Sequence, residues 1–223
     1  MKKLKSTQEL INREDPAWPL VKQWIAGATN PVEVLPPPDD VAREKNLFGV
    51  QVSTRSPMGA IIYESGGILV DQGWLRILGS GHPRLPRSLL DWNYGRSFGD
   101  SGEQPSFLLV ADDVVGGFFA IDGGGLGFAP GKVCYLPPDT LAWENTGKGY
   151  SDFLVWCFNG DLEKYYGTMR WQDWQRDLLS IRGDEMFGII PPLCVAGPPI
   201  DERSRNPVRA AKIYELHVAR SDK

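Results

Sequence analysis

Short apolar runs separated by glycine and aspartate turns fill the middle of the chain. Two blocks, residues 66–81 and 107–122, alternate β-compatible runs with Gly or Asp-Gly turns. Tight turns between such runs are typical of consecutive antiparallel strands. The pattern continues at 132–136 and, more weakly, at 141–144. These residues therefore predict a meandering sheet.

Helical patterns flank this sheet on both sides. Before it, helix-capping residues predict short helices that start at Ser6, Asp15-Pro16, Asp39 or Asp40, and Ser56-Pro57. Asn30-Pro31 and the prolines at 36–38 predict an irregular connector over residues 30–38, and residues 49–52 predict a short strand.

After the sheet, one helix is predicted to end at Asn159-Gly160, and Asp161 caps the next. Four apolar residues at three- and four-residue steps predict a further amphipathic helix, and these are Trp171, Trp174, Leu178 and Ile181. From Gly188 onward, prolines and glycines predict irregular structure until a late strand at 211–218.

Together these elements predict an α+β fold, with a single, mostly antiparallel meandering sheet and helices packed on one face. One domain of 223 residues is long enough to bury such a core. Within it, residues 1–56 form a helical arm and connector, 57–183 form the core, and 184–223 form a Pro/Gly-rich tail with the late strand.

Composition excludes several classes of function. Lys and Arg total 24 against 28 Asp and Glu, a net charge of −4, and no basic stripe is present to bind nucleic acid. No apolar run approaches the roughly 20 residues needed to cross a bilayer. The thiols Cys134, Cys157 and Cys194 lie in apolar runs, which favours buried, reduced cysteines and a cytoplasmic protein.

Candidate catalytic motifs fail on their spacing. Gly99-Asp-Ser-Gly102 resembles a serine nucleophile motif with His82 upstream, but Glu103 replaces the next glycine, which favours a polar loop. The glycines between 116 and 127 fit no phosphate-binding pattern. The two histidines, His82 and His217, have no local partner for a metal. We therefore predict no catalytic residue, cofactor or metal site.

Acidic and tryptophan side chains supply the remaining candidates. Asp112, Asp113 and Asp122 are the best carboxylate group for acid-base work or a divalent cation, but they are interpreted as turn or surface residues. Partner contact, and catalysis or metal binding, are the alternatives for these three. In the run Trp74 to Leu78, Trp74 and Arg76 share one strand face. Most tryptophans fall on predicted buried faces, and those left as exposed platforms are Trp74, Trp92 and Trp143. Core packing is the alternative for these three.

The order of these segments resembles the SUKH superfamily, which includes bacterial toxin-immunity proteins. Residues 63–67 resemble that family's helix ending in a Gly-Gly turn, 74–79 its next strand, and 107–122 its central hairpin. The family's Leu-Gly-x-x-Leu-Pro signature is not clear here. The whole chain is more narrowly similar to a bacterial family named as a domain of unknown function (number 2625), with Trp171 and Trp174 in its Arg-Trp-x-x-Trp segment.

This resemblance, together with the missing catalytic cluster, implies a non-catalytic cytoplasmic module that occludes another protein, such as a toxin domain. The anchors and charged rim of its binding surface would be Trp74, Trp92, Trp143, Arg76, Asp112 and Asp113. The alternative is a small-molecule or glycan-binding protein, perhaps weakly hydrolytic, with a site between residues 82–103 and the sheet. A deep apolar cleft with convergent Asp112, Asp122 or His82 would favour that alternative.

Overall fold

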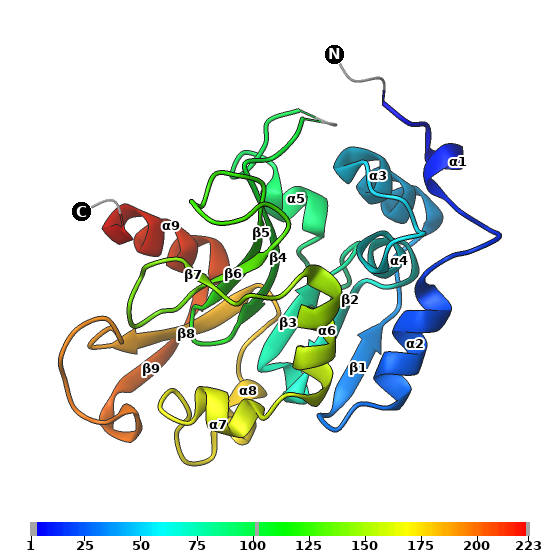
Figure 1. The fold of residues 1–223 in the computed structure, drawn as a ribbon. Helices are drawn as coiled ribbons and strands as arrows, with labels where there is room; N and C mark the ends of the chain where they lie inside the picture. The colour runs from blue at the N-terminus through cyan, green and yellow to red at the C-terminus, as the bar shows by residue number, and fades with distance from the viewer. Residues whose placement is uncertain (1–3, 101–102, 222–223) are drawn as a thin grey trace.

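The computed structural model describes residues 4–100 and 103–221 (Figure 1). In chain order its elements are α1 (Thr7–Leu10), α2 (Trp18–Ala26), β1 (Val32–Leu35), α3 (Asp40–Val50), α4 (Pro57–Glu64), β2 (Gly67–Val70), η1 (Asp71–Gly73), β3 (Leu75–Leu78), α5 (Leu89–Asn93), β4 (Phe107–Asp113), β5 (Phe118–Asp122), β6 (Val133–Leu136), β7 (Glu144–Asn145), α6 (Tyr150–Asn159), α7 (Leu162–Tyr166), α8 (Trp174–Leu178), β8 (Glu185–Ile190), η2 (Ile200–Glu202), β9 (Ser204–Arg209) and α9 (Ala210–Ser221). Over these described residues, every helix is too short or too polar to span a membrane.

Strands β1 to β7 form a seven-stranded sheet in chain order, and each pairs antiparallel with the next. Antiparallel neighbours need only short connections, which the glycine and aspartate turns supply. In this register Arg76 lies opposite Asp112, and Asp112 lies opposite Phe118. The predicted α+β class and antiparallel meander are confirmed.

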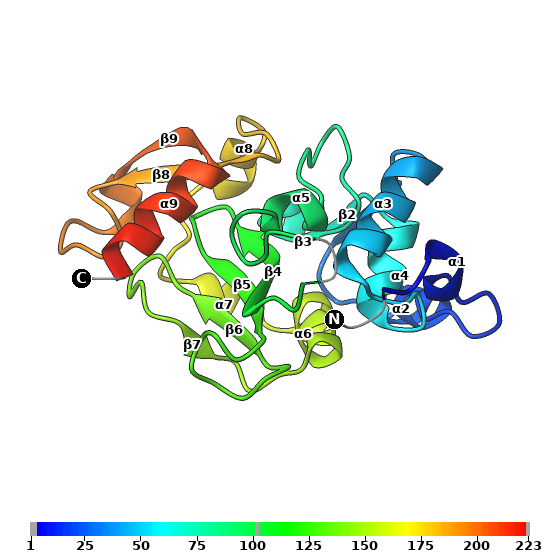
Figure 2. The ribbon, with the colours of Figure 1, turned by 90° about the horizontal axis from the view of Figure 1, so that it is seen from above.

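Both faces of the sheet are covered. Residues directly opposite each other share a face, so Arg76, Asp112 and Phe118 define one of them, called here the arginine face. Phe119 and Tyr135 define the other, called the aromatic face. Figure 2 shows α6 and α7 on the aromatic face, and α5, α9 and the β8–β9 hairpin on the arginine face. The sequence led us to expect helices on one face, whereas the cover extends to both.

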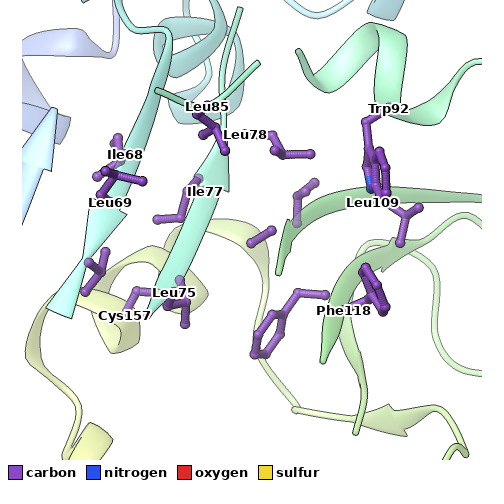
Figure 3. Close-up of a cluster of buried hydrophobic side chains, with 14 of the residues drawn as sticks. Ile68, Leu69, Leu75, Ile77, Leu78, Leu85, Trp92, Leu109, Phe118 and Cys157 are labelled. Carbon is purple, nitrogen blue, oxygen red and sulfur yellow. The ribbon is translucent and has the colours of Figure 1, made fainter. Parts of the chain in front are cut away.

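Apolar side chains fill both interfaces. On the arginine face the ring centroids of Phe118 and Tyr214 lie 5.0 Å apart, and on the aromatic face those of Phe119 and Phe153 lie 4.9 Å apart. Figure 3 shows the core continuing from β2 and β3 toward α5, where Trp92 packs. Because fully burying one large apolar side chain contributes about 1.5–3 kcal/mol, these two interfaces are the main source of stability.

Helix starts follow the predicted capping residues in four helices. Their first-turn N–H groups donate to the side chains of Ser6, Asp39, Ser56 and Asp161. Helix α2 is the exception, because it begins at Trp18 after Ala17 and not at Asp15.

Three segments before β4 differ from the predictions. Residues 32–35, predicted as connector, form the edge strand β1, because they pair with β2. Residues 49–52 are not a strand, since α3 continues to Val50 and Gln51 ends it in a left-handed conformation with φ 56°. The predicted loop 82–103 contains the helix α5.

Two later elements are shorter than predicted. Strand β7 covers Glu144–Asn145, not 141–144. The predicted amphipathic helix reduces to α8, because Asp173 adopts a left-handed conformation (φ 63°) that separates Trp171 from the helix. Trp171 is nevertheless buried.

The predicted structure of the tail is wrong. Strands β8 and β9 form a separate two-stranded sheet, and residues 211–218, predicted as a late strand, lie within the helix α9. Ala210, Ile213 and Tyr214 are buried at helical spacing. Their burial therefore stabilises a helix, although the alternation of apolar and polar residues suggested a strand. The edge strand β9 accommodates Pro207, as edge strands do.

Candidate functional site

The end of strand β4 carries two adjacent acids with different surroundings. Asp112 and Asp113 are both fully buried. As consecutive strand residues they point to opposite faces, Asp112 to the arginine face and Asp113 to the aromatic face. Each therefore needs its own set of partners, because an unpaired buried carboxylate is strongly unfavourable.

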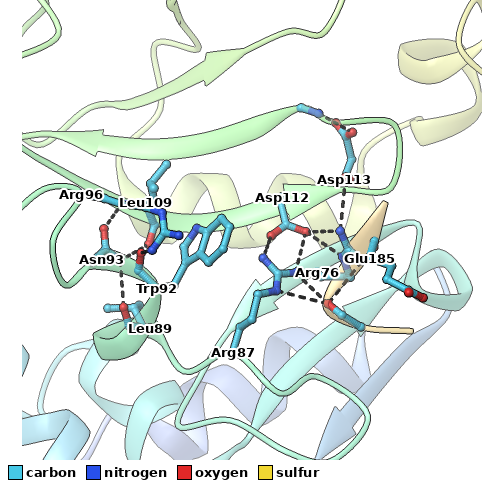
Figure 4. Close-up of polar contacts among 12 residues, drawn as sticks. Arg76, Arg87, Leu89, Trp92, Asn93, Arg96, Leu109, Asp112, Asp113 and Glu185 are labelled. Carbon is cyan, nitrogen blue, oxygen red and sulfur yellow. Dashed lines mark hydrogen bonds and ion pairs between the residues drawn. The ribbon is translucent and has the colours of Figure 1, made fainter. Parts of the chain in front are cut away.

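On the arginine face, Asp112 binds two buried guanidinium groups. Arg76 Nε donates to its Oδ1 at 2.6 Å, and Arg87 Nη1 donates to its Oδ2 at 2.5 Å (Figure 4). The other donors reach main-chain oxygens: Arg76 Nη1 donates to Glu185 O at 2.6 Å, and Arg87 Nη2 to Gly183 O at 2.9 Å. The arginine cluster, Arg76, Arg87 and Asp112, thus joins β3 and β4 to the segment that leads into β8.

The arginine cluster carries excess positive charge, since two guanidinium groups share one carboxylate. Burial lowers the pKa of Arg76, and the neighbouring Asp112 opposes that change. An arginine side chain stays protonated in proteins, so both groups are cations. The region next to the cluster is consequently favourable for an anion.

Helix α5 completes this face. The guanidinium carbons of Arg87 and Arg96 lie 4.7 and 4.3 Å from the ring centre of Trp92. The Asn93 side chain both donates to Leu109 O and accepts from Leu109 N, each at 2.8 Å (Figure 4). Asn93 thereby takes the place of a strand partner beyond the end of β3.

A pocket of about 490 Å³ opens beside the arginine cluster. We call it the sheet–loop pocket, because it lies between β2 and β3, the loop at 83–86, and residues 175–184. Apolar side chains contribute to its wall, namely Leu69, Val114, Leu178, Leu179 and Ile181. Charged groups are contributed by Arg76, Arg84, Arg182 and Asp184.

The mouth of the sheet–loop pocket is exposed. Leu179 is 88% exposed, which is unusual for a large apolar residue. Arg84 binds both carboxylate oxygens of Glu33, and Arg182 lies 3.2 Å from Glu185 Oε1. The Arg84–Glu33 pair is solvent-exposed and therefore weak, whereas Arg182 pairs its exposed guanidinium group with the largely buried Glu185 carboxylate.

The lining of this pocket contains few reactive side chains. Among the described residues that line it there is no Ser, Thr, Cys, His, Lys or Tyr. The buried carboxylate of Asp112 is already held by the two arginines. The carboxylate in the described lining is that of Asp184, whose Oδ1 lies 3.7 Å from Arg182 Nε.

Backbone strain occurs at one wall of the same pocket. Asp71 and Gln72 have φ values of 51° and 60°, and Gln72 lines the pocket. Residues other than glycine that adopt the left-handed backbone conformation cluster at functional sites. The turn is held by Arg170, which binds the Asp71 carboxylate and lies 4.8 Å from the Trp74 ring centre.

On the aromatic face, Asp113 accepts three hydrogen bonds. They come from Tyr135 Oη at 2.7 Å, Gly117 N at 2.8 Å and Val115 N at 3.1 Å. Burial raises the pKa of Asp113, and these hydrogen bonds oppose the rise. Burial also raises the pKa of Tyr135, so its hydroxyl keeps the proton that it donates.

The residues predicted as exposed partner contacts are mostly interior. Those that the structure buries are Trp74, Arg76, Trp92, Asp112 and Asp113. Trp143 is half-buried and packs against Phe107. The prediction that these side chains present a free surface is therefore wrong for five of the six. Their burial has a physical reason, because each charged group found an ionic or hydrogen-bonded partner and the indoles lie under arginines.

Other candidate residues do not converge. Asp122 caps its own turn, accepting from the N–H groups of Gly124 and Leu126 at 2.6 and 3.1 Å, as its interpretation as a turn residue predicted. His82 Nδ1 accepts from Arg84 N. Ser101 of the serine motif lies outside the described residues. Within the described part of the chain, no three His, Cys, Asp or Glu side chains are grouped to hold a metal ion.

The cysteines largely follow the prediction. Cys134 and Cys157 are buried, and Cys194 is partly exposed. Burial raises the pKa of Cys134 to about 11, and it also raises that of Cys157. Thiols with a raised pKa are poor nucleophiles at neutral pH.

Sequence reasoning missed Arg87, Arg170, Gln72 and Arg182. Arg87 is separated from Asp112 by 25 residues, and Arg76 from Glu185 by 109. No local pattern signals partners at such distances. The Arg170-Trp171 pair was visible in the sequence, but only its tryptophan was considered.

Relatives of the chain are found over nearly its whole length. A Haemophilus influenzae protein described as uncharacterized is 44% identical over 221 residues, covering 99% of this chain and 96% of the relative. YbfG of Escherichia coli (strain K12), also described as uncharacterized, is 43% identical over 213 residues, with 96% and 95% covered. Residues 7–213 match the family described as protein of unknown function DUF2625. The chain therefore belongs to the DUF2625 family.

Proposed function

We propose that this protein is a non-catalytic binding protein whose sheet–loop pocket takes a small amphipathic molecule with an anionic group. One observation carries the proposal: an open pocket of about 490 Å³ with an apolar wall adjoins a buried cluster of two arginines and one aspartate. Ligand pockets commonly measure about 300–1,000 Å³ and combine an apolar lining with a few polar groups.

The charges around the pocket favour an anion. Its described lining holds three arginines and one aspartate, Arg76, Arg84, Arg182 and Asp184. The donors of Arg76 are already used by Asp112, Glu185 O and Asp113 O, so Arg76 acts through its electric field. Direct contact falls to Arg84 and Arg182, whose own side chains are 57% and 69% exposed.

The apolar wall favours a hydrocarbon portion over a sugar. Leu69 and Val114 are nearly fully buried beneath the pocket, and Leu178 borders it. Sugars are usually held by stacking on aromatic rings, and the described lining contains none. A carboxylate or phosphate attached to a short alkyl or aryl group matches this arrangement.

The test uses octanoate as the probe and octan-1-ol as its uncharged counterpart. Octanoate is expected to raise the melting temperature of the intact protein, because binding to the native state stabilises it. Arg182→Gln should weaken the effect, whereas Arg55→Gln, which changes an exposed arginine remote from the pocket, should not. Equal stabilisation by octanol, or no stabilisation by octanoate and a panel of aryl phosphates, would contradict the proposal.

A protein partner is the second candidate function, in the manner of SUKH immunity proteins. Leu179, 88% exposed at the pocket mouth, supports it, because an exposed leucine beside charged residues resembles the anchor of an interface. The relation to SUKH proteins is supported by α4 ending just before Gly66-Gly67, with β2 and β3 following. A toxin domain encoded next to this gene would be the partner.

Co-purification with neighbouring-gene products tests this second function. Leu179→Ser should reduce recovery of the partner at least tenfold, and Leu20→Ser, an exposed leucine on α2, should leave recovery unchanged. Recovery that is equal for both variants would remove the case for Leu179. We place both functions in the cytoplasm, where the free thiols of Cys134 and Cys157 remain reduced. Cell fractionation checks that placement.

A further inference from the structure

A second pocket, of about 300 Å³, opens on the aromatic face of the sheet. We call it the aromatic pocket, because rings from β5, β6, α6 and α7 line it: Phe119, Tyr135, Phe153, Trp156 and Tyr165. It lies across the sheet from the arginine cluster, on the face where Phe153 of α6 packs against Phe119 of β5 and Tyr165 of α7 packs against Tyr135 of β6; Figure 1 places these helices. It is therefore separate from the sheet–loop pocket.

The rings form a connected group with several inclinations. Phe119 stacks on Tyr135 with ring centroids 4.4 Å apart, and Tyr135 is tilted against Tyr165 at 6.0 Å. Trp156 meets Tyr165 edge to face at 4.9 Å, with an interplanar angle of 75°. Phe119, Tyr135 and Phe153 are buried beneath the pocket, so Trp156 and Tyr165 are the more exposed rings that border its open space. Tyr165 is 42% exposed, so that space is open to solvent.

Two carboxylates lie at or behind the aromatic pocket. Asp113 lies behind Tyr135 and accepts a hydrogen bond from its hydroxyl at 2.7 Å, which enriches the phenol ring in electrons. Glu144, exposed on β7, lines the pocket. Asp113, Glu144 and, farther away, Asp139 all raise the pKa of Tyr165, after the larger effect of burial. Of these carboxylates, Glu144 lines the opening, and Asp113 lies buried behind Tyr135.

A single lysine is the cation among the described lining residues. Lys148 Nζ lies 6.0 Å from the ring centre of Trp156 and donates to Thr146 O at 3.4 Å. It therefore occupies the outer edge of a cation–π contact. The position of the Lys148 ammonium group beside Trp156 indicates where the cationic group of a ligand would bind.

We propose that the aromatic pocket binds an organic cation of the quaternary ammonium type. Ring faces attract a cation through their quadrupole, most strongly for Trp and then Tyr. A quaternary ammonium group is large and weakly hydrated, so it loses little on entering a ring-lined space. Glu144 supplies the counter-charge, and Lys148 competes for the same position. This inference is independent of the proposed anion site.

The first test compares choline with 3,3-dimethylbutan-1-ol, which has the same shape and no charge. Titration calorimetry of the intact protein should give choline at least about a tenfold higher affinity. A tenfold ratio corresponds to about 1.4 kcal/mol, within the range of a desolvated cation–π contact. Equal affinity would mean a merely apolar pocket, and absence of choline binding would mean no cation site. Either result overturns the proposal.

The second test uses Lys148→Met, which keeps an unbranched side chain and removes the competing charge. Choline affinity is expected to rise severalfold, and a fall would overturn the proposal. Glu144→Gln should lower the affinity severalfold, and Trp156→Leu should lower it at least tenfold.

If Trp156→Leu does not fold, Trp156→Phe replaces it, and a fall of a few fold is expected because Phe binds cations more weakly than Trp. Arg182→Gln in the sheet–loop pocket is the matched control and should leave choline binding unchanged. Loss of choline binding in this control would show that choline binds in the sheet–loop pocket, and it would contradict the proposed cation site in the aromatic pocket.

Discussion

The two faces of β4 accommodate adjacent carboxylates in opposite ways. Asp112 is held by two guanidinium groups at 2.6 and 2.5 Å, and the surplus charge there is positive. Asp113 is held by a phenol hydroxyl and two backbone N–H groups, and the surplus charge there is negative. The two acids of one strand thus have surroundings of opposite charge on the two faces of the sheet.

The difference shows that burial alone does not determine what a charged residue does. A buried carboxylate paired with buried arginines and the arginines themselves stabilise each other. Removing either partner therefore leaves an unpaired charge in the interior. An acid held by dipoles depends on geometry that several neutral donors share. The two acids should therefore respond differently to the same substitution.

The largest expected effect is a difference between Asp112→Asn and Asp113→Asn. The former leaves two buried guanidinium groups without an anion and should cost about 3–5 kcal/mol of the free energy of unfolding. The latter keeps an oxygen for Val115 N and Gly117 N and should cost about 1–2 kcal/mol. Urea denaturation measures both. Equal losses, or a larger loss for Asp113→Asn, would break the comparison.

Next in size is Tyr135→Phe on the aromatic face. It removes the donor to a buried carboxylate, and such charge-assisted bonds contribute about 1.5–3 kcal/mol. The free energy of unfolding should fall by about 2 kcal/mol. Tyr94→Phe, on a side chain that is 60% exposed, is the control and should change little. A variant at position 135 as stable as the control would show that Asp113 does not need the phenol.

His217 allows a pH test of the arginine face. Burial, reinforced by Arg220, lowers the pKa of His217 to about 4. Between the ordinary value near 6.5 and about 4, the unfolded chain binds a proton that the folded chain excludes. Stability should therefore be fully present above pH 6.5 and fall as the pH drops toward 4, by on the order of 2 kcal/mol.

The measurement for His217 is the free energy of unfolding at several pH values, compared with His217→Gln. The variant lacks the titrating group, so the wild-type curve should fall relative to it across this window. Parallel curves would show that His217 is accessible to protons in the folded state.

The smallest effect is expected at the mouth of the sheet–loop pocket. Arg84 and Glu33 are about half exposed, at 57% and 53%, and exposed ion pairs contribute about 0–1 kcal/mol. Arg84→Gln should therefore lower the melting temperature little while weakening octanoate binding. A large loss of stability would assign Arg84 a structural role and not a ligand-binding one.

Features with local determinants were predictable from the sequence. The hairpin of β4 and β5 follows from apolar runs around Asp113 and Gly117, and helix caps such as Ser56 follow from a side chain within three residues of its partner. The turn role of Asp122 is local in the same sense, since its partners lie two to six residues away. Contacts of this kind join residues that are close in the sequence, so the sequence alone can predict them.

Features that depend on distant partners were not predictable. Arg76 looked like an exposed strand residue because Asp112 and Glu185 O come from other parts of the chain. Trp92 looked exposed because the arginines above it could not be placed. In α9 the apparent alternation hid a helical face formed by Ala210, Ile213 and Tyr214, and only packing on the hairpin distinguishes the two.

The C-terminal hairpin is attached to the sheet through main-chain oxygens, and this limits which positions must keep their residue type. Arg76 and Arg87 bind the carbonyl oxygens of residues 183 and 185, and every amino acid offers a carbonyl. Side chains at 184 and 185 can thus vary without loosening this joint. Gly183 cannot, because a Cβ there would lie 2.1 Å from Arg84 O. The side chains on this side of the sheet–loop pocket can therefore change during evolution, while the glycine at position 183 must be kept.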